Sequence, residues 1–126
     1  MSAALGGRTI VVVGGVTGIG RAAVSLLSRS GAQVALVDSS ESVVEVAEAL
    51  GAQGFSANVG RASEVESAFR SIGERFGKIH GVFANAGINP GGAGIHQETT
   101  EAWDEVMSVN LRGMFLVVRE GVRSFM

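Results

Sequence analysis

The chain has 126 residues and a formal net charge of −2, and 46% of its residues are hydrophobic and 17% charged. This size suits one domain or part of one, and the content is too apolar for a disordered chain. The mildly acidic balance gives no basic surface for nucleic acid or an anionic membrane, and the lack of cysteine excludes disulfides, thiolate nucleophiles and Cys-ligated zinc. No apolar run approaches the roughly 20 residues of a membrane span, and residues 1–7 lack the basic start of a secretory signal. We therefore expect a cytoplasmic protein that contacts neither membrane nor nucleic acid.

Short apolar runs alternate with amphipathic segments along the whole chain. The predicted strands are residues 9–13, 33–37, 54–57 and 79–84. A helix is expected after each strand, with glycines at 31, 51 and 77 marking the ends of the first three helices. Ser63 and Glu66 have the spacing of a capping box at the start of the third helix. A glycine-rich loop follows the fourth strand, and the chain from about Thr100 is expected to be helical, with Trp103 in the core.

The order βαβαβαβα with short connections predicts an α/β fold. Such alternation forms a parallel sheet with right-handed crossovers and helices on both faces. The sequence shows no linker, internal repeat or low-complexity tract, so residues 1–126 are interpreted as a single domain.

The glycine-rich segment 14–20 joins the first strand to the first helix, where dinucleotides bind in many α/β proteins. Gly14 allows a tight turn, Gly18 allows the backbone to approach a pyrophosphate, and Gly20 allows the helix to pack close to the sheet. The free N–H groups at the start of the helix can then bind the phosphates. The alternative is a structural turn without a ligand.

Asp38 stands at the end of the second predicted strand, eighteen residues after Gly20. A carboxylate at this position can accept hydrogen bonds from both hydroxyls of an adenosine ribose, and it repels the 2′-phosphate of NADP. The cofactor is therefore expected to be NAD, in preference to NADP. In the alternative interpretation, Asp38 only caps the turn that follows it.

The spacing Gly-x-x-x-Gly-x-Gly in this loop resembles the short-chain dehydrogenase/reductase family. Three more segments match family motifs in the expected order: Asn58-Val59, Asn85-Ala86-Gly87 and the run 109–115, which reads Val-Asn-Leu-Arg-Gly-Met-Phe. The resemblance covers essentially the whole chain. It implies the N-terminal part of a three-layer, doubly wound Rossmann-like domain with strand order 3-2-1-4.

The resemblance also implies a cofactor site. Its residues would be Gly14, Thr17, Gly18, Ile19, Gly20, Asp38, Asn58, Val59, Asn85, Ala86 and Gly87. Asn58 replaces an aspartate that usually contacts adenine in the family, and its amide oxygen can still accept from the adenine amine. No metal site is expected.

In the family, the catalytic Ser and the Tyr-x-x-x-Lys pair follow the fifth helix, whereas this chain stops at the close of that helix and contains no tyrosine. Its only lysine, Lys78, precedes the fourth predicted strand. Asn110 is therefore the one catalytic residue that the resemblance carries over, and in the family it holds a water in a proton relay. The alternative for Asn110 is an ordinary buried amide that is hydrogen-bonded to nearby backbone.

These features predict an NAD(H)-binding protein of the short-chain dehydrogenase/reductase type, a family that transfers hydride between NAD(P) and an alcohol or carbonyl substrate. The chain alone is expected to be inactive. It is interpreted as a truncated gene product, a non-catalytic dinucleotide-binding or interaction module, or one half of a split dehydrogenase. A homo-oligomer is expected, because the fourth strand would be an open edge and the last helix would expose residues such as Met114, Val118 and Phe125.

Overall fold

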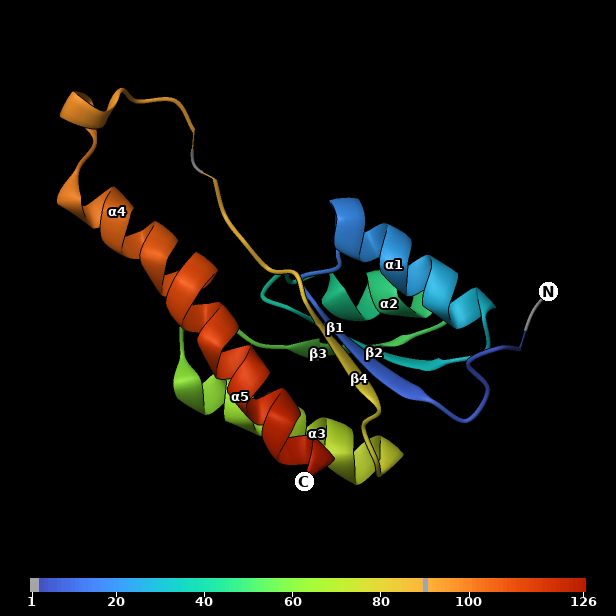
Figure 1. Ribbon diagram of the computed structural model, residues 1–126. Coiled ribbons are helices and arrows are strands. Elements are labelled where there is room, and N and C mark those ends of the chain that lie inside the picture. Colours follow the sequence, from blue (N-terminus) through green and yellow to red (C-terminus); the bar gives the residue numbers. More distant parts are fainter. Residues whose placement is uncertain (1–2, 90) are drawn as a thin grey trace.

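The computed structural model describes residues 3–89 and 91–126 of the chain and contains one parallel sheet (Figure 1). Its strands are β1 (Thr9–Val13), β2 (Gln33–Asp38), β3 (Gln53–Ser56) and β4 (Gly81–Ala84). Their order is β3-β2-β1-β4, and all three neighbouring pairs are parallel. The predicted α/β class and the predicted strand order are therefore confirmed.

Helices cover both faces of this sheet (Figure 1). They are α1 (Gly18–Arg29), α2 (Val43–Ala49), α3 (Ala62–Phe76), α4 (Thr100–Met107) and α5 (Met114–Phe125). The first two pack on one face, and α3 and α5 pack on the other. A 3₁₀ turn, η1 (Ile95–Gln97), precedes α4, and a π-helical turn, η2 (Ser108–Gly113), joins α4 to α5.

The central strand β1 explains why the protein has two cores. Val11 and Val13 point into the core under α3 and α5, whereas Val12 points into the core under α1 and α2. All three side chains are at most 1% exposed. A run of β-branched residues without polar alternation therefore forms a strand that is buried on both faces.

The predicted boundary of the fourth strand was wrong by two residues. Ile79 is 2% exposed, but it lies before the strand, and the ladder with β1 starts at the pair Ile10–Gly81. Just before this ladder, His80 forms two hydrogen bonds with Thr9: its N–H donates to the carbonyl of Thr9, and its Nδ1 accepts from the N–H of Thr9. This exchange with His80 precedes the regular β4 pairing.

The predicted capping box of the third helix was also wrong. The helix begins at Ala62, one residue before Ser63, and its N-cap, Arg61, makes no side-chain capping bond. The cause is a turn at residues 58–61, in which the N–H of Arg61 donates to the carbonyl of Asn58. Glu64, rather than Glu66, accepts a backbone hydrogen bond at the start of this helix: its Oε1 accepts from the N–H of Asn58 at 3.0 Å.

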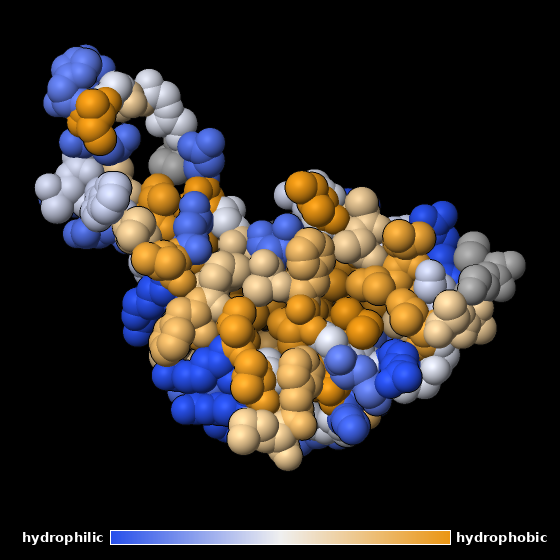
Figure 2. Space-filling model, viewed as in Figure 1, coloured by the Kyte–Doolittle hydropathy of each residue, from blue (hydrophilic) through white to orange (hydrophobic). Residues whose placement is uncertain are grey.

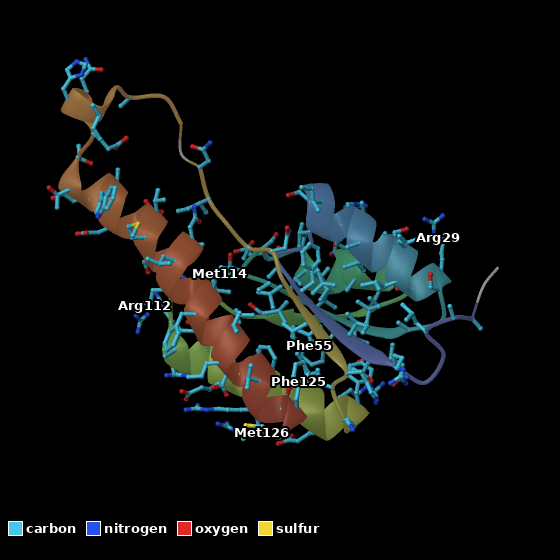
Figure 3. The ribbon with its side chains drawn as sticks, viewed as in Figure 1. Arg29, Phe55, Arg112, Met114, Phe125 and Met126 are labelled. Atoms are coloured by element: carbon cyan, nitrogen blue, oxygen red, sulfur yellow. The ribbon has the colours of Figure 1, made fainter. Side chains whose placement is uncertain are left out.

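The C-terminal helical region is less buried than its apolar spacing suggests. Trp103 is 56% exposed and Asn110 is exposed, so the predicted core positions of both were wrong. The reason is that α4 extends beyond the sheet (Figure 1) and has no buried residue. Met114, in contrast, is half-buried: it packs against the core beside the sheet (Figure 3), and it also lines the shallow groove along α5. Across residues 3–89 and 91–126, no helix has the length and hydropathy needed to cross a bilayer.

Candidate functional site

The loop between β1 and α1 is enclosed by the carboxyl ends of the neighbouring strands. Gly14 has φ +85°, its N–H donates to the Val37 carbonyl, and its carbonyl accepts from Nδ2 of Asn85 at 2.7 Å. A Cβ on Gly14 would lie 2.5 Å from Cα of Ala86. The backbone of the β4–α4 connection therefore approaches this loop as closely as glycine permits.

Gly18 and Gly20 meet two different requirements in the same loop. Gly18 has φ +62°, and nothing lies within 4 Å of the position of an added Cβ, so this turn has open space beside it. A Cβ on Gly20 would overlap the carbonyl oxygen of Gly14, because α1 crosses directly over the loop. Gly20 therefore lets α1 pack closely on the glycine-rich loop and on Asn85, which follows β4.

The start of α1 offers uncapped N–H groups. Thr17 is the N-cap residue, but its side chain makes no capping bond, and the first turn of α1 contains no acidic side chain. No side chain of Thr17 or of the first turn of α1 therefore offsets the partial positive charge of this helix N-terminus. An anionic group such as a pyrophosphate fits this environment.

Both carboxylate oxygens of Asp38 accept backbone hydrogen bonds. Oδ1 accepts from the N–H of Ser40 at 2.9 Å, and Oδ2 accepts from the N–H of Val16 at 3.2 Å. Asp38 therefore caps the turn after β2, as the alternative interpretation held, and it also ties the glycine-rich loop to β2. Each oxygen keeps a further lone pair for a ligand hydroxyl.

A cavity of about 300 Å³ opens between these loops. Eight of the eleven predicted cofactor residues line it: Gly14, Thr17, Asp38, Asn58, Val59, Asn85, Ala86 and Gly87. Gly18, Ile19 and Gly20 do not, and the side chain of Ile19 is 74% exposed at the start of α1. The sheet topology thus brings the ends of all four strands to a single pocket.

Six further residues of this pocket were not predicted: Val13, Val37, Ser39, Ala57, Ile88 and Val109. The first five are sequence neighbours of predicted residues at the ends of strands. Their only sequence signal is this adjacency, since the carboxyl ends of parallel strands converge at one edge of a sheet.

Asn110 does not line the pocket but holds one of its walls. Its Oδ1 accepts from the N–H of Ile88 at 2.7 Å, and its Nδ2 donates to the carbonyl of the same residue at 2.8 Å. The predicted bonding to backbone is therefore present, although the side chain is exposed. Asn110 holds the β4–α4 connection beside the cavity by using both ends of its amide.

Glu64 supports the opposite wall of the pocket. The N–H of Asn58 holds the pKa of the Glu64 carboxyl below its ordinary value of 4.5, and the nearby Arg61 guanidinium, 3.2 Å from Oε2, acts in the same direction. Glu64 is therefore a charged acceptor at neutral pH. Among the residues that the structure describes, no group of three or more His, Asp or Glu is placed to hold a metal ion.

Comparisons with known proteins relate this geometry to a family. The family model described as short chain dehydrogenase matches residues 8–126. A curated relative, 2-(S)-hydroxypropyl-CoM dehydrogenase 3 of Xanthobacter autotrophicus, is 37% identical over 122 residues, which are 92% of this chain and 48% of that protein. Levodione reductase of Leifsonia aquatica is 36% identical over 117 residues, which are 86% of this chain and 44% of that protein.

Solved structures give the same result. The crystal structure of levodione reductase matches with a TM-score of 0.90 at 32% identity, over 95% of this chain and 50% of that one. The 3-ketoacyl-(acyl-carrier-protein) reductase from Brucella melitensis, solved with NADH, matches with a TM-score of 0.92 at 27% identity, over 96% of this chain and 51% of that one. The chain thus spans about half the length of the relatives that it matches. It belongs to the short-chain dehydrogenase/reductase family, whose members bind a nicotinamide dinucleotide on this Rossmann-type sheet.

Proposed function

We propose that this chain binds NAD(H) and forms the adenosine-binding part of a short-chain dehydrogenase/reductase. The observation that carries the proposal is the pocket at the carboxyl ends of β1, β2, β3 and β4, which eight of the eleven predicted cofactor residues line. The uncapped start of α1 supports a pyrophosphate position next to Thr17, since it supplies free N–H groups. In the complete family enzymes, the nicotinamide exchanges hydride with an alcohol or carbonyl carbon, and we propose substrates of this class.

We propose further that NAD is preferred over NADP. Asp38 supports this preference, because its carboxylate lines the pocket and is held in place by two backbone N–H groups. A 2′-phosphate beside this carboxylate would be repelled, by about 4 kcal/mol for unit charges 4 Å apart in a partly buried site. The loop 14–18 itself contains no arginine or lysine, although Arg21 of α1 donates from Nη1 to the carbonyl of Val16 at 3.2 Å.

Calorimetric titration of NAD and NADP into the wild type and Asp38→Asn tests both proposals. The asparagine removes the charge and keeps one oxygen acceptor, so the preference for NAD should fall by about tenfold or more. Asp104→Asn, in α4 and away from the pocket, is the matched control and should leave the ratio unchanged. A wild type that binds NADP more tightly than NAD refutes the preference, and a wild type that binds neither refutes the proposed function.

We propose that these 126 residues do not turn over substrate by themselves. They contain no tyrosine, and Asn110 is engaged with Ile88 by both ends of its amide. General acid–base catalysis contributes about 10²–10⁴-fold to such reactions, and the carboxylate that lines the pocket, Asp38, is engaged by two backbone N–H groups. Turnover on the order of 1 s⁻¹ in an NADH absorbance assay would contradict this proposal.

We also propose that the chain forms a homo-oligomer through α5. The support is a row of exposed apolar side chains that flank a shallow, apolar groove: Leu111, Phe115, Val118 and Val122. Figure 2 shows hydrophobic residues gathered over this part of the surface. β4 adds an edge that pairs only with β1 among the described strands.

A further inference from the structure

Asn58 and Val59 lie at the end of the pocket where the proposed NAD site would hold the adenine base. This end contains two hydrogen-bond donors without partners among the described residues. Oδ1 of Asn58 accepts from the N–H of Gly60 at 2.9 Å, which fixes the orientation of the carboxamide because only its oxygen can accept. Its Nδ2 group then has no acceptor in the part of the chain that the structure describes. The backbone N–H of Val59 has no acceptor there either. Both residues line the cavity.

The loop that presents these donors is held from several sides. The carbonyl of Gly60 accepts from Nη1 of Arg112 at 2.9 Å, and Arg112 reaches it from the π-helical turn (Figure 3). A Cβ on Gly113 would lie 2.8 Å from Cγ2 of Val59, so this turn also packs directly against the loop. The orientation of Asn58 is therefore set by the surrounding protein before any ligand binds.

The difference between a carboxamide and a carboxylate at this position determines which purine fits. An ionised aspartate has only acceptors, which match the 6-amino group of adenine and repel a 6-oxo group. Asn58 exposes a donor that can serve a 6-oxo oxygen, and the N–H of Val59 is a second donor to the base. The remaining lone pair of Oδ1 of Asn58 can accept either from the N1–H of a 6-oxopurine or from the 6-amino group of adenine.

We propose that Asn58 is a specificity-determining residue that lets the pocket bind 6-oxopurine (hypoxanthine) dinucleotides about as well as adenine dinucleotides. The inference rests on the proposed NAD site and deepens it. Specificity is a difference between two affinities, and Asn58 lacks the repulsive element that would exclude the 6-oxo base.

Calorimetric titration of NAD and of nicotinamide hypoxanthine dinucleotide into the wild type and Asn58→Asp tests the inference. Aspartate can still accept from the N–H of Gly60, so this substitution keeps the turn, removes the donor and adds a negative charge. In the wild type, the two dissociation constants should agree within about threefold. In Asn58→Asp, the adenine form should bind about tenfold more tightly than the hypoxanthine form.

Asn89→Asp is the matched control, because Asn89 accepts from the N–H of Gly91 in the same kind of turn and lies outside the pocket. It should leave the ratio unchanged. A wild type that prefers NAD by more than tenfold overturns the inference even if Asn58→Asp fails to fold, and so does a folded Asn58→Asp with the wild-type ratio. In both cases NAD still binds and the proposed function stands, whereas binding of neither dinucleotide refutes both.

Discussion

Gly20→Ala should destabilise the protein, although alanine is the better helix former. An added Cβ would overlap the carbonyl oxygen of Gly14, and it would lie 2.7 Å from Cα of Gly15 and 2.8 Å from Nδ2 of Asn85. Two of these three neighbours are backbone, which cannot move away without opening the glycine-rich loop. The substitution therefore forces α1 away from the loop or disrupts the bond between Asn85 and Gly14.

The expected magnitude follows from three contributions. Overpacking of this kind costs about 1–3 kcal/mol, and loss of the hydrogen bond from Asn85 adds about 0.5–1.5 kcal/mol. The higher helix propensity of alanine offsets about 0.8–1 kcal/mol of this cost. The net loss is about 0.5–3.7 kcal/mol, which corresponds to a fall in Tm of roughly 2–15 °C for a chain of this size.

Gly73→Ala provides the matched control. Gly73 lies inside α3, has no positive φ, and has nothing within 4 Å of an added Cβ. Alanine there should raise stability by about 0.5–1 kcal/mol. Thermal unfolding followed by circular dichroism compares the two variants with the wild type, and a Tm for Gly20→Ala at or above the wild-type value would refute the packing argument.

Three further outcomes are expected. Asn110→Ala should lower the free energy of unfolding by about 1–2 kcal/mol and speed amide hydrogen exchange at Ile88. An unchanged exchange rate at Ile88 would show that the two hydrogen bonds do not hold the pocket wall. Glu64→Gln should be less stable than the wild type at neutral pH. Because the folded-state pKa of Glu64 is lowered, this difference in stability should shrink as the pH falls from about 6 to about 3. A difference in unfolding temperature that stays constant over this range would contradict the role given to the Glu64 carboxylate. Phe115→Glu should convert an oligomer to a monomer in size-exclusion chromatography with light scattering, while Leu26→Glu on α1 should not. A wild-type chain that is already a stable monomer would refute the proposed homo-oligomer.

The sheet could be predicted from sequence because its signals are local. The run at Thr9–Val13 is apolar at nearly every position, and the helical segment between each pair of successive strands favours a parallel arrangement with crossovers. The same rule explains the pocket, because Asp38 ends β2, Asn85 directly follows β4, and parallel strands end at one edge. Eight of the predicted cofactor residues meet there for this reason.

Other features depend on partners that the sequence pattern does not identify. The spacing of Ser63 and Glu66 satisfies the rule for a capping box, but the turn at residues 58–61 starts the helix one residue earlier and brings in Glu64. The spacing of Trp103 matches an apolar face, but α4 extends past the sheet and has no surface to cover. The sequence also does not predict the orientation of the Asn58 carboxamide, whose Oδ1 accepts from the N–H of Gly60 and whose Nδ2 has no acceptor among the described residues.

The π-helical turn Ser108–Gly113 has a consequence for how the C-terminal helical region tolerates insertions and deletions. A π turn holds about one more residue than an α turn, so it takes up an extra residue while the helices on either side keep nearly the same rotational phase. Removing one residue would restore a regular helix and change the positions of the residues within this turn. Asn110 would then leave Ile88, and Arg112 would leave Gly60. A single deletion in this turn should therefore loosen both walls of the pocket, whereas a deletion near the end of α5 should affect neither.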